Sequence, residues 1–303
     1  MSQAFVASVI QQAISGNNKV NNLQESAEHV RDAVEQGAEL VVLQALHGTR
    51  YFCQTEDRSN FALAEHLDAF TQEFCCELAE ELDIVLVASL FEKRSSGLYH
   101  NTALVIDGAE GCVGVYRTMH ISDDPGNYEK YYFTPGDVTG LHKGFEPIPT
   151  RLGRLGVLVG RDQWYPEAAR LMSMAGADLL IYPSATGWDP DDSEAEQDNQ
   201  LDAWLTIQRS HAVANGVPVL VANRTGFEPS PEHEETGLEF WGTSFIAGPQ
   251  GELLASANIE EEGAFCAEID LQQAESIRQM WPYFRDRRID AYGNLLNRWI
   301  DDD

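Results

Sequence analysis

Apolar residues along this chain follow two alternating spacings. Runs of β-branched and aliphatic residues, such as 5–10 and 38–44, are typical of strands. Between these runs Leu23, Ala27 and Val30 lie three or four positions apart, which indicates the apolar face of a helix. By the same criteria the first half is predicted to contain strands at 5–10, 38–44, 83–91 and, as a hairpin, 101–117, with helices at about 23–34 and 63–78.

The second half repeats this alternation after a long loop at about 118–143. Its apolar runs predict strands at 155–159, 177–183, 217–223, 243–247, 253–257 and 263–269, with helices from Pro166 and over about 201–215. The segment 189–200, DPDDSEAEQDNQ, is so polar that we expect a surface loop. Helices early and hairpins late in each half favour a four-layer α-β-β-α sandwich of two mixed sheets, predicted to form one domain over residues 1–303.

The charge balance restricts the possible partners. The chain has 49 acidic and 20 basic residues and a formal net charge of −29, so nucleic acid and anionic membrane surfaces would be repelled. Two explanations of the acidity stay open: a solvated surface suited to a salty cytoplasm, or attraction of a cationic ligand such as a polyamine. Because no apolar stretch of about 18 residues occurs, we expect no membrane-spanning segment and a cytoplasmic location.

Cysteine and histidine spacing indicates neither disulfides nor metal. The cysteines are odd in number and lack the spacing of a disulfide framework, so reduced thiols are expected. They are Cys53, Cys75, Cys76, Cys112 and Cys266. Since neither they nor the histidines show metal-ligand spacing, we expect no metal and no other cofactor.

The stretch GVLVGRDQWYPE, residues 156–167, indicates a functional site. An apolar run leads into Gly160, and Pro166 marks a helix start, so a sharp strand-to-helix turn is predicted. Elbows of this kind commonly display a nucleophile. Here the apex is Gly160, which has no side chain, followed by Arg161.

Longer motifs extend over nearly the whole chain. They are Tyr128–Phe133 followed by Pro135 and Gly136, the segments 162–188, 211–226 and 240–252, and WPYFRDRRIDAYGNL at 281–295. In these motifs the sequence resembles the carbon–nitrogen hydrolase (nitrilase) superfamily and, within it, the N-carbamoylputrescine amidohydrolase family of polyamine biosynthesis. The resemblance implies C–N bond hydrolysis by a cysteine nucleophile, a glutamate that accepts its proton and a lysine that stabilises the oxyanion.

The three catalytic side chains that the resemblance implies are absent. Ala45 occupies the glutamate position, Thr118 the lysine position and Gly160 the cysteine position. None of the replacements has the missing chemistry, since Ala45 cannot titrate and Thr118 carries no charge. Removing one member of a catalytic unit already removes most of its rate enhancement. Efficient hydrolysis by the family's mechanism is therefore not expected.

Several residues around these positions are retained. Glu129, a further carboxylate position of the family, either holds a ligand or supports its loop through hydrogen bonds. Arg161 either fills the nucleophile space and pairs with Glu129, or points to solvent or to a neighbouring subunit. Asp162, Gln163 and Trp164 are expected to hold the backbone of the elbow and to pack the pocket wall.

Substitute nucleophiles are a further possibility. Cys53 is more simply structural, and Ser184 and Thr186, at positions where the family contacts substrate, lack a nearby base in the sequence. A hydroxyl–histidine–aspartate arrangement stays open, because His47 and His120 could both approach the site.

The C-terminal tail, residues 281–303, is rich in aromatic residues and arginine, which gather at protein interfaces. The resemblance implies subunit contacts here, in a homo-oligomer or in a hetero-oligomer with an active paralogue. Three functions stay open: an inactive partner of such a paralogue, a sensor that binds a polyamine or carbamoyl compound, and an active hydrolase that uses other groups.

Overall fold

Two six-stranded sheets form the centre of the computed structural model, which describes residues 4–140, 143–189, 191–231 and 235–300. The first sheet contains β1 (Ala4–Gln11), β2 (Ala38–Val42), β3 (Val85–Ser95), β4 (Leu98–Asp107), β5 (Gly111–Arg117) and β15 (Gly263–Asp270), in the order β15-β1-β2-β3-β4-β5. The second contains β6 (Ile148–Thr150), β7 (Gly153–Val157), β8 (Leu179–Pro183), β10 (Val219–Ala222), β13 (Phe245–Ala247) and β14 (Leu253–Ser256), in the order β14-β13-β10-β8-β7-β6. A small third sheet consists of β9 (Gly187–Trp188), β11 (Thr225–Pro229) and β12 (Gly237–Trp241).

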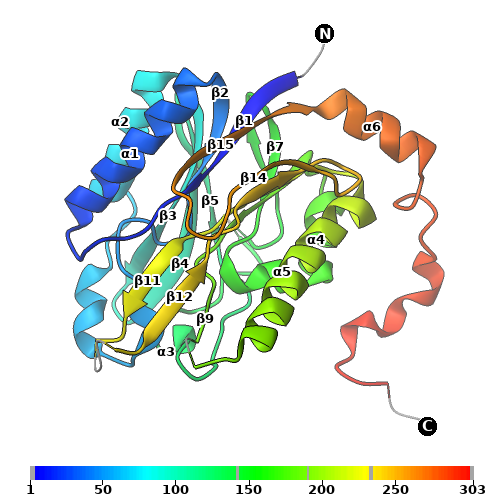
Figure 1. The fold of residues 1–303 in the computed structure, drawn as a ribbon. Coiled ribbons are helices and arrows are strands. Elements are labelled where there is room, and N and C mark those ends of the chain that lie inside the picture. Colours follow the sequence, from blue (N-terminus) through cyan, green and yellow to red (C-terminus); the bar gives the residue numbers. More distant parts are fainter. Residues whose placement is uncertain (1–3, 141–142, 190, 232–234, 301–303) are drawn as a thin grey trace.

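Helices cover the outer faces of the two large sheets. They are α1 (Lys19–Glu35) and α2 (Phe70–Leu82) on one sheet and α4 (Pro166–Met174) and α5 (Glu194–Asn215) on the other. The short α3 (Glu129–Tyr132) lies in the loop after β5, and α6 (Leu271–Met280) follows β15. Figure 1 shows α1 and α2 on one side of the molecule and α4 and α5 on the other. The predicted four-layer α-β-β-α sandwich is therefore confirmed.

Strand periodicity explains how the layers form. In and just after β2, Leu40 and Val42 pack between the two sheets, whereas Val41 and Leu43 pack under the helices. Successive side chains of a strand point to opposite faces, so a continuous apolar run can bury both faces of its sheet. The same alternation in both sheets produces a core between them and a second core beneath α1 and α2.

The structure corrects two boundaries predicted from the sequence. The helix expected at 63–78 is α2, which begins only at Phe70, because Asp68 adopts a left-handed backbone with φ of 64°. The expected surface loop at 189–200 ends earlier, because α5 begins at Glu194. The Ser193 side chain caps that helix by accepting a hydrogen bond from the Glu196 amide at 3.3 Å, so a polar sequence still starts a helix.

The segment after α6 leaves the sandwich (orange to red in Figure 1). In its described residues, 281–300, the regular structure consists of two short 3₁₀ turns, at Ile289–Ala291 and Gly293–Leu296. Large apolar side chains are exposed from the last residue of α6 onward, namely Met280, Trp281, Tyr283, Ile289, Tyr292, Leu295, Leu296, Trp299 and Ile300. None of the helices in the described ranges has the length and apolar character that a membrane span requires.

Candidate functional site

A cavity of about 580 Å³ lies where loops from the two large sheets meet. Ala45 follows β2, Gly160 follows β7, and Thr186 follows β8, and all three line the cavity. The carboxyl ends of strands in α/β sheets commonly border ligand sites. The positions that the sequence singled out at 45 and 160 are therefore brought together.

The elbow points an empty position into this cavity. Gly160 has a φ of +56°, and a Cβ atom built on it would meet no heavy atom within 4 Å. The backbone then turns through a 3₁₀ segment, Gly160–Trp164, before Pro166 starts α4. A side chain at position 160 would have open space, although a left-handed φ costs residues other than glycine about 1–2 kcal/mol.

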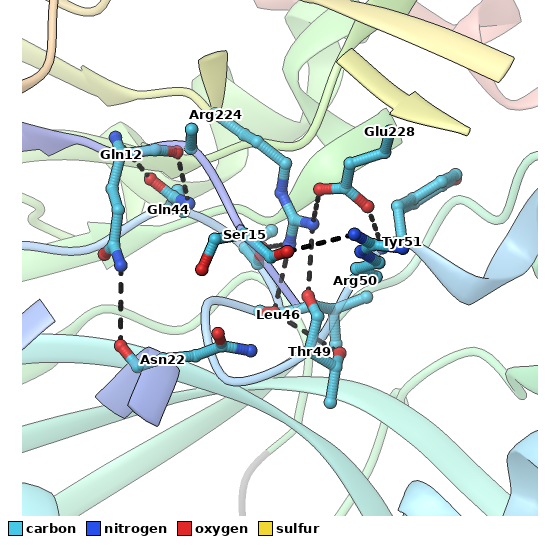
Figure 2. Close-up of polar contacts among 12 residues, drawn as sticks. Gln12, Ser15, Asn22, Gln44, Leu46, Thr49, Arg50, Tyr51, Arg224 and Glu228 are labelled. Atoms are coloured by element: carbon cyan, nitrogen blue, oxygen red, sulfur yellow. Dashed lines mark hydrogen bonds and ion pairs between the residues drawn. The ribbon is translucent and has the colours of Figure 1, made fainter. Parts of the chain in front are cut away.

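Ala45 lies on a loop that a buried cation fixes. The Arg224 guanidinium donates a hydrogen bond to the carbonyl oxygen of Ala45 at 2.9 Å. It also donates to the carbonyl oxygens of Leu46 at 3.0 Å and Thr49 at 3.1 Å (Figure 2). The Ala45 amide donates to the Ser184 carbonyl oxygen at 3.1 Å, which ties the loop to the other sheet. The backbone at position 45 is thus held from two sides.

Glu228 completes this clamp. Its carboxylate pairs with Arg224 at 2.5 Å and accepts a hydrogen bond from the Tyr51 amide at 2.6 Å (Figure 2). Both side chains of the pair are fully buried. The loop includes Leu46, whose φ of 53° is strained for a residue with a side chain and persists because its neighbours are fixed.

Thr118 lies beside the cavity, behind its wall. Its amide and its hydroxyl both donate to the Asn101 carbonyl oxygen, at 3.1 and 3.2 Å, and Asn101 lines the cavity. Its own carbonyl oxygen accepts a hydrogen bond from the Gly136 amide at 3.0 Å. The residue therefore joins two loops and adds no charge to the site.

Glu129 is buried, 6% exposed, and its carboxyl group borders the cavity. Burial raises its pKa to about 7, although the Tyr51 hydroxyl, the Ser122 backbone and the charge of Arg161 act in the opposite direction. The Tyr51 hydroxyl donates to Glu129 at 3.1 Å and also hydrogen bonds to Asn127. This carboxyl group changes charge near neutral pH.

Arg161 does not pair with Glu129, the first of the two interpretations of the sequence, and its side chain is 37% exposed. It lines the cavity, but its guanidinium pairs with the partly exposed Asp124 at 2.8 Å instead of with Glu129. Asp189, Asp191 and Asp192 add further carboxylates to the cavity lining. The described lining is therefore strongly acidic, with Arg161 already paired.

Asp162 lies beneath the elbow, fully buried. Its carboxylate accepts hydrogen bonds from the Tyr116 hydroxyl at 2.8 Å and from the Met119 amide at 3.2 Å. It also contacts the His120 amide at 2.9 Å and the His120 ring nitrogen Nδ1 at 2.6 Å. Asp162 thus connects the elbow to the loop after β5.

Gln163 and Trp164 line the cavity. The Gln163 amide side chain accepts from the Ser184 hydroxyl at 2.8 Å and donates to the Thr186 hydroxyl at 3.1 Å. Ser184 is fully buried and uses its hydroxyl in this contact, so it supports the wall from behind. The ring of His211 also contacts the Gln163 carbonyl oxygen at 2.9 Å.

The histidines do not complete a hydroxyl–histidine–aspartate triad facing the cavity. His120 bonds to Asp162, but its ring stacks on Tyr165 with centroids 3.7 Å apart, and it is not part of the cavity lining in the described residues. His47 is buried against the Ser26 hydroxyl, 3.3 Å from its Nδ1. Burial and the charges of Arg224 and Lys19 lower the pKa of His47 to about 3, so it is neutral.

Cys53 is also unsuited to act as a nucleophile. It is fully buried among aromatic residues, and burial raises the pKa of its thiol well above the ordinary value. A thiolate is the reactive form, so this thiol has the character of a core residue.

Arg224 and Glu228 are the site residues that the sequence interpretation missed. A signal was present in VPVLVANRTGFEP at 217–229, where two charges four residues apart follow directly after an apolar strand. Buried charges are nearly always paired, so a charge at the end of a buried strand predicts such a partner. The sequence could not show that both side chains reach the loop after β2.

Comparison with known proteins identifies the family to which the chain belongs. The Carbon-nitrogen hydrolase family matches residues 6–279. This chain belongs to the carbon-nitrogen hydrolase family. The "N-carbamoylputrescine amidase" of Arabidopsis thaliana is 40% identical over 270 residues, 88% of this chain and 87% of that protein. The "Citrullinase" of Francisella tularensis is 33% identical over 283 residues, 93% of this chain and 95% of that protein.

A solved structure supports the same assignment. A carbon-nitrogen hydrolase from Helicobacter pylori superposes with a TM-score of 0.93 at 48% sequence identity and covers 98% of this chain and 100% of its own. The family, the sandwich and the likeness to N-carbamoylputrescine amidases are thus established. Whether the acidic cavity with Ala45, Thr118 and Gly160 supports catalysis is a separate question.

Proposed function

We propose that this chain is a catalytically inactive, N-carbamoylputrescine amidase-like protein that serves as a structural or regulatory oligomer partner of an active paralogue in polyamine biosynthesis. The observation that supports this most directly is Gly160, because the apex of the elbow faces the cavity without a side chain. Ala45 adds no base, and Thr118 adds no cation. A cysteine-based mechanism therefore lacks its nucleophile, its base and its oxyanion partner together.

Inactivity has a direct test. The purified protein is expected to release no ammonia from N-carbamoylputrescine above the blank without protein. One observation favours the alternative of an active hydrolase, namely that the pKa of Glu129 is about 7, which suits a general base near neutral pH. Turnover that disappears in Glu129→Gln would support that alternative.

Partnership is supported by the exposed tail. Monomeric proteins rarely expose large contiguous apolar surfaces, and Trp281, Tyr283 and Trp299 are exposed on one segment. Co-expression with an active paralogue followed by native mass spectrometry tests it. We expect particles that contain both chains, and strictly homomeric particles would contradict the partnership.

A second candidate function is the binding of a cationic ligand. The carboxylates of Asp189, Asp191 and Asp192 and the buried Glu129 line the cavity, which suits a diamine or a carbamoyl compound with an ammonium group. Calorimetry with putrescine at low and high salt tests this candidate, with Glu129→Gln as the control. Heat of binding at both salt concentrations, and less heat with Glu129→Gln than with wild type, would support specific binding. No heat of binding at either salt concentration would rule out this function.

A further inference from the structure

A single cationic side chain, that of Arg161, lies among the described residues that line the cavity of about 580 Å³. It follows directly after the empty apex at Gly160. Its guanidinium pairs with Asp124 at 2.8 Å, and the two side chains are 37% and 53% exposed. Exposed ion pairs contribute little to stability, because water competes for both charges. A carboxylate from outside can therefore replace Asp124 on this guanidinium without disturbing the fold.

The guanidinium of Arg161 has the chemistry of a carboxylate receptor. Its N–H donors form a planar fork that matches the two oxygens of a carboxylate, and such charge-assisted pairs are stronger than neutral hydrogen bonds. The positive charge of Arg161 also lies close enough to Glu129 to act on its carboxyl group by lowering its pKa, against the larger effect of burial. The charge of Arg161 thus acts inside the cavity, where a bound molecule would lie.

Two buried amide side chains of the cavity lining are only partly paired. Asn101 is 2% exposed, and its Oδ1 atom accepts from the Ser89 hydroxyl at 3.3 Å, whereas its Nδ2 atom has no hydrogen-bond partner among the described residues. Gln54 is 8% exposed, and its Nε2 atom donates to the Glu228 carbonyl oxygen at 3.1 Å, whereas its Oε1 atom has no such partner in the described ranges. A few polar groups of this kind orient a small ligand in its pocket. The cavity therefore offers a donor and an acceptor besides its charges.

Carboxylates line the cavity from other segments of the chain. Asp189, Asp191 and Asp192 come from the segment between β9 and α5, and Glu129 comes from α3. These groups attract ammonium groups and repel a ligand that carries only negative charge. A diamine, in turn, has no group that accepts hydrogen bonds from Arg161. A ligand that uses both kinds of side chain has ammonium groups and a carboxylate in one molecule.

We propose that the cavity binds a basic α-amino acid, whose carboxylate replaces Asp124 on the guanidinium of Arg161. Its ammonium groups then lie against the carboxylates of Asp189, Asp191 and Asp192. Such a ligand carries one carboxylate and two ammonium groups, which complements a lining with one cation and several carboxylates. This inference rests on the cationic ligand of the second candidate function and names its chemical class.

Isothermal titration calorimetry of the full-length protein with two matched probes tests the inference. L-Ornithine and putrescine share the same carbon chain with two ammonium groups, and they differ only in the α-carboxylate. Neither contains an amide or ureido C–N bond, so binding is measured without turnover. At one pH and one salt concentration, we expect the dissociation constant of L-ornithine to be about tenfold lower than that of putrescine.

Two variants test whether Arg161 causes this preference. Arg161→Gln removes the guanidinium and should bring the dissociation constants of the two probes to within about twofold of each other. Asp124→Asn removes the competing carboxylate and should increase the preference for L-ornithine by about threefold. Arg94→Gln is the matched control, because Arg94 forms a similar exposed pair with Asp137 at 2.6 Å and neither residue lines the cavity. It should leave the preference unchanged.

Equal dissociation constants for the two probes would overturn the inference, and so would a preference for L-ornithine that survives in Arg161→Gln. Either result, with putrescine bound, would leave the cationic ligand of the second candidate function intact. Heat of binding from neither probe would overturn both. The proposed inactivity is tested separately, because ammonia release is measured with N-carbamoylputrescine, a compound different from both probes.

Discussion

The guanidinium of Arg224 donates a hydrogen bond of 2.9 Å to the main-chain carbonyl oxygen of Ala45. A fully buried cation therefore holds the backbone at a position where the side chain has no catalytic group. The empty elbow at Gly160 and the carboxyl group of Glu129 face the same cavity. The scaffold of the site is thus kept, although the groups that the family resemblance implies are missing from it.

Breaking the buried clamp should destabilise the protein strongly. Arg224→Met leaves the Glu228 carboxylate buried without its counter-ion and removes donors from three carbonyl oxygens. We expect a loss of about 3–5 kcal/mol in the free energy of unfolding, measured by urea denaturation. Arg31→Met, which breaks an exposed pair with Glu81, is the matched control and should cost less than about 1 kcal/mol. Equal losses in the two variants would contradict the role of the clamp.

Glu129 should make stability depend on pH. Its pKa is about 7 in the folded protein against an ordinary value of 4.5, so the folded state binds the proton more tightly than the unfolded state. The carboxyl group is without effect below pH about 4.5 and lowers stability as the pH rises from about 4.5 to about 7, by up to about 3 kcal/mol. Glu129→Gln removes this term and should gain stability relative to wild type at pH 8.

The measurement is the free energy of unfolding of both proteins between pH 4 and pH 8, roughly the range over which this group titrates. Glu110→Gln, the same chemical change at an exposed position, controls for the loss of one negative charge. A difference between wild type and Glu129→Gln that stays constant across this range would show that the carboxyl group titrates normally.

Restoring the side chains that the resemblance implies should restore chemistry. The combination Ala45→Glu, Thr118→Lys and Gly160→Cys places a base, a cation and a nucleophile on a backbone that is already held. At position 160 a Cβ atom meets nothing within 4 Å. We expect ammonia release from N-carbamoylputrescine to rise at least about a hundredfold over the wild type, the scale of one acid–base group.

A matched variant sharpens this prediction. Replacing Ala45 by Gln in the same combination keeps the size of the new side chain but removes its ability to accept a proton. It should remain near the blank. If the Glu variant is folded and equally inactive, the three positions do not form the catalytic unit.

The sequence predicted the layers well because periodicity determines them locally. Leu40 and Val41 point to opposite faces of β2 whatever their distant partners are, so an apolar run predicts a sheet covered on both sides. The beginning of α5 was harder to predict. There Ser193 starts a helix by a single capping bond inside a segment whose composition is typical of a loop.

Only those parts of the site that depend on residues close together in the sequence could be predicted. The elbow and its apex at Gly160 follow from a strand that runs into a helix, and the sandwich brings Ala45 to the same cavity. The contact between Arg161 and Asp124 joins residues 37 positions apart. The hydrogen bond from Arg224 to Ala45, in the loop after β2, joins residues 179 positions apart. Such contacts depend on packing that no spacing rule describes.

Ammonia release from N-carbamoylputrescine tests the central claim most directly, with the Arabidopsis N-carbamoylputrescine amidase run alongside under the same salt. We predict a rate that cannot be distinguished from the blank without protein. Turnover within about a hundredfold of that enzyme, a difference of about 2.7 kcal/mol in the barrier, would contradict the claim. It would mean that the interpretation of Ala45, Thr118 and Gly160 is wrong or that another nucleophile acts.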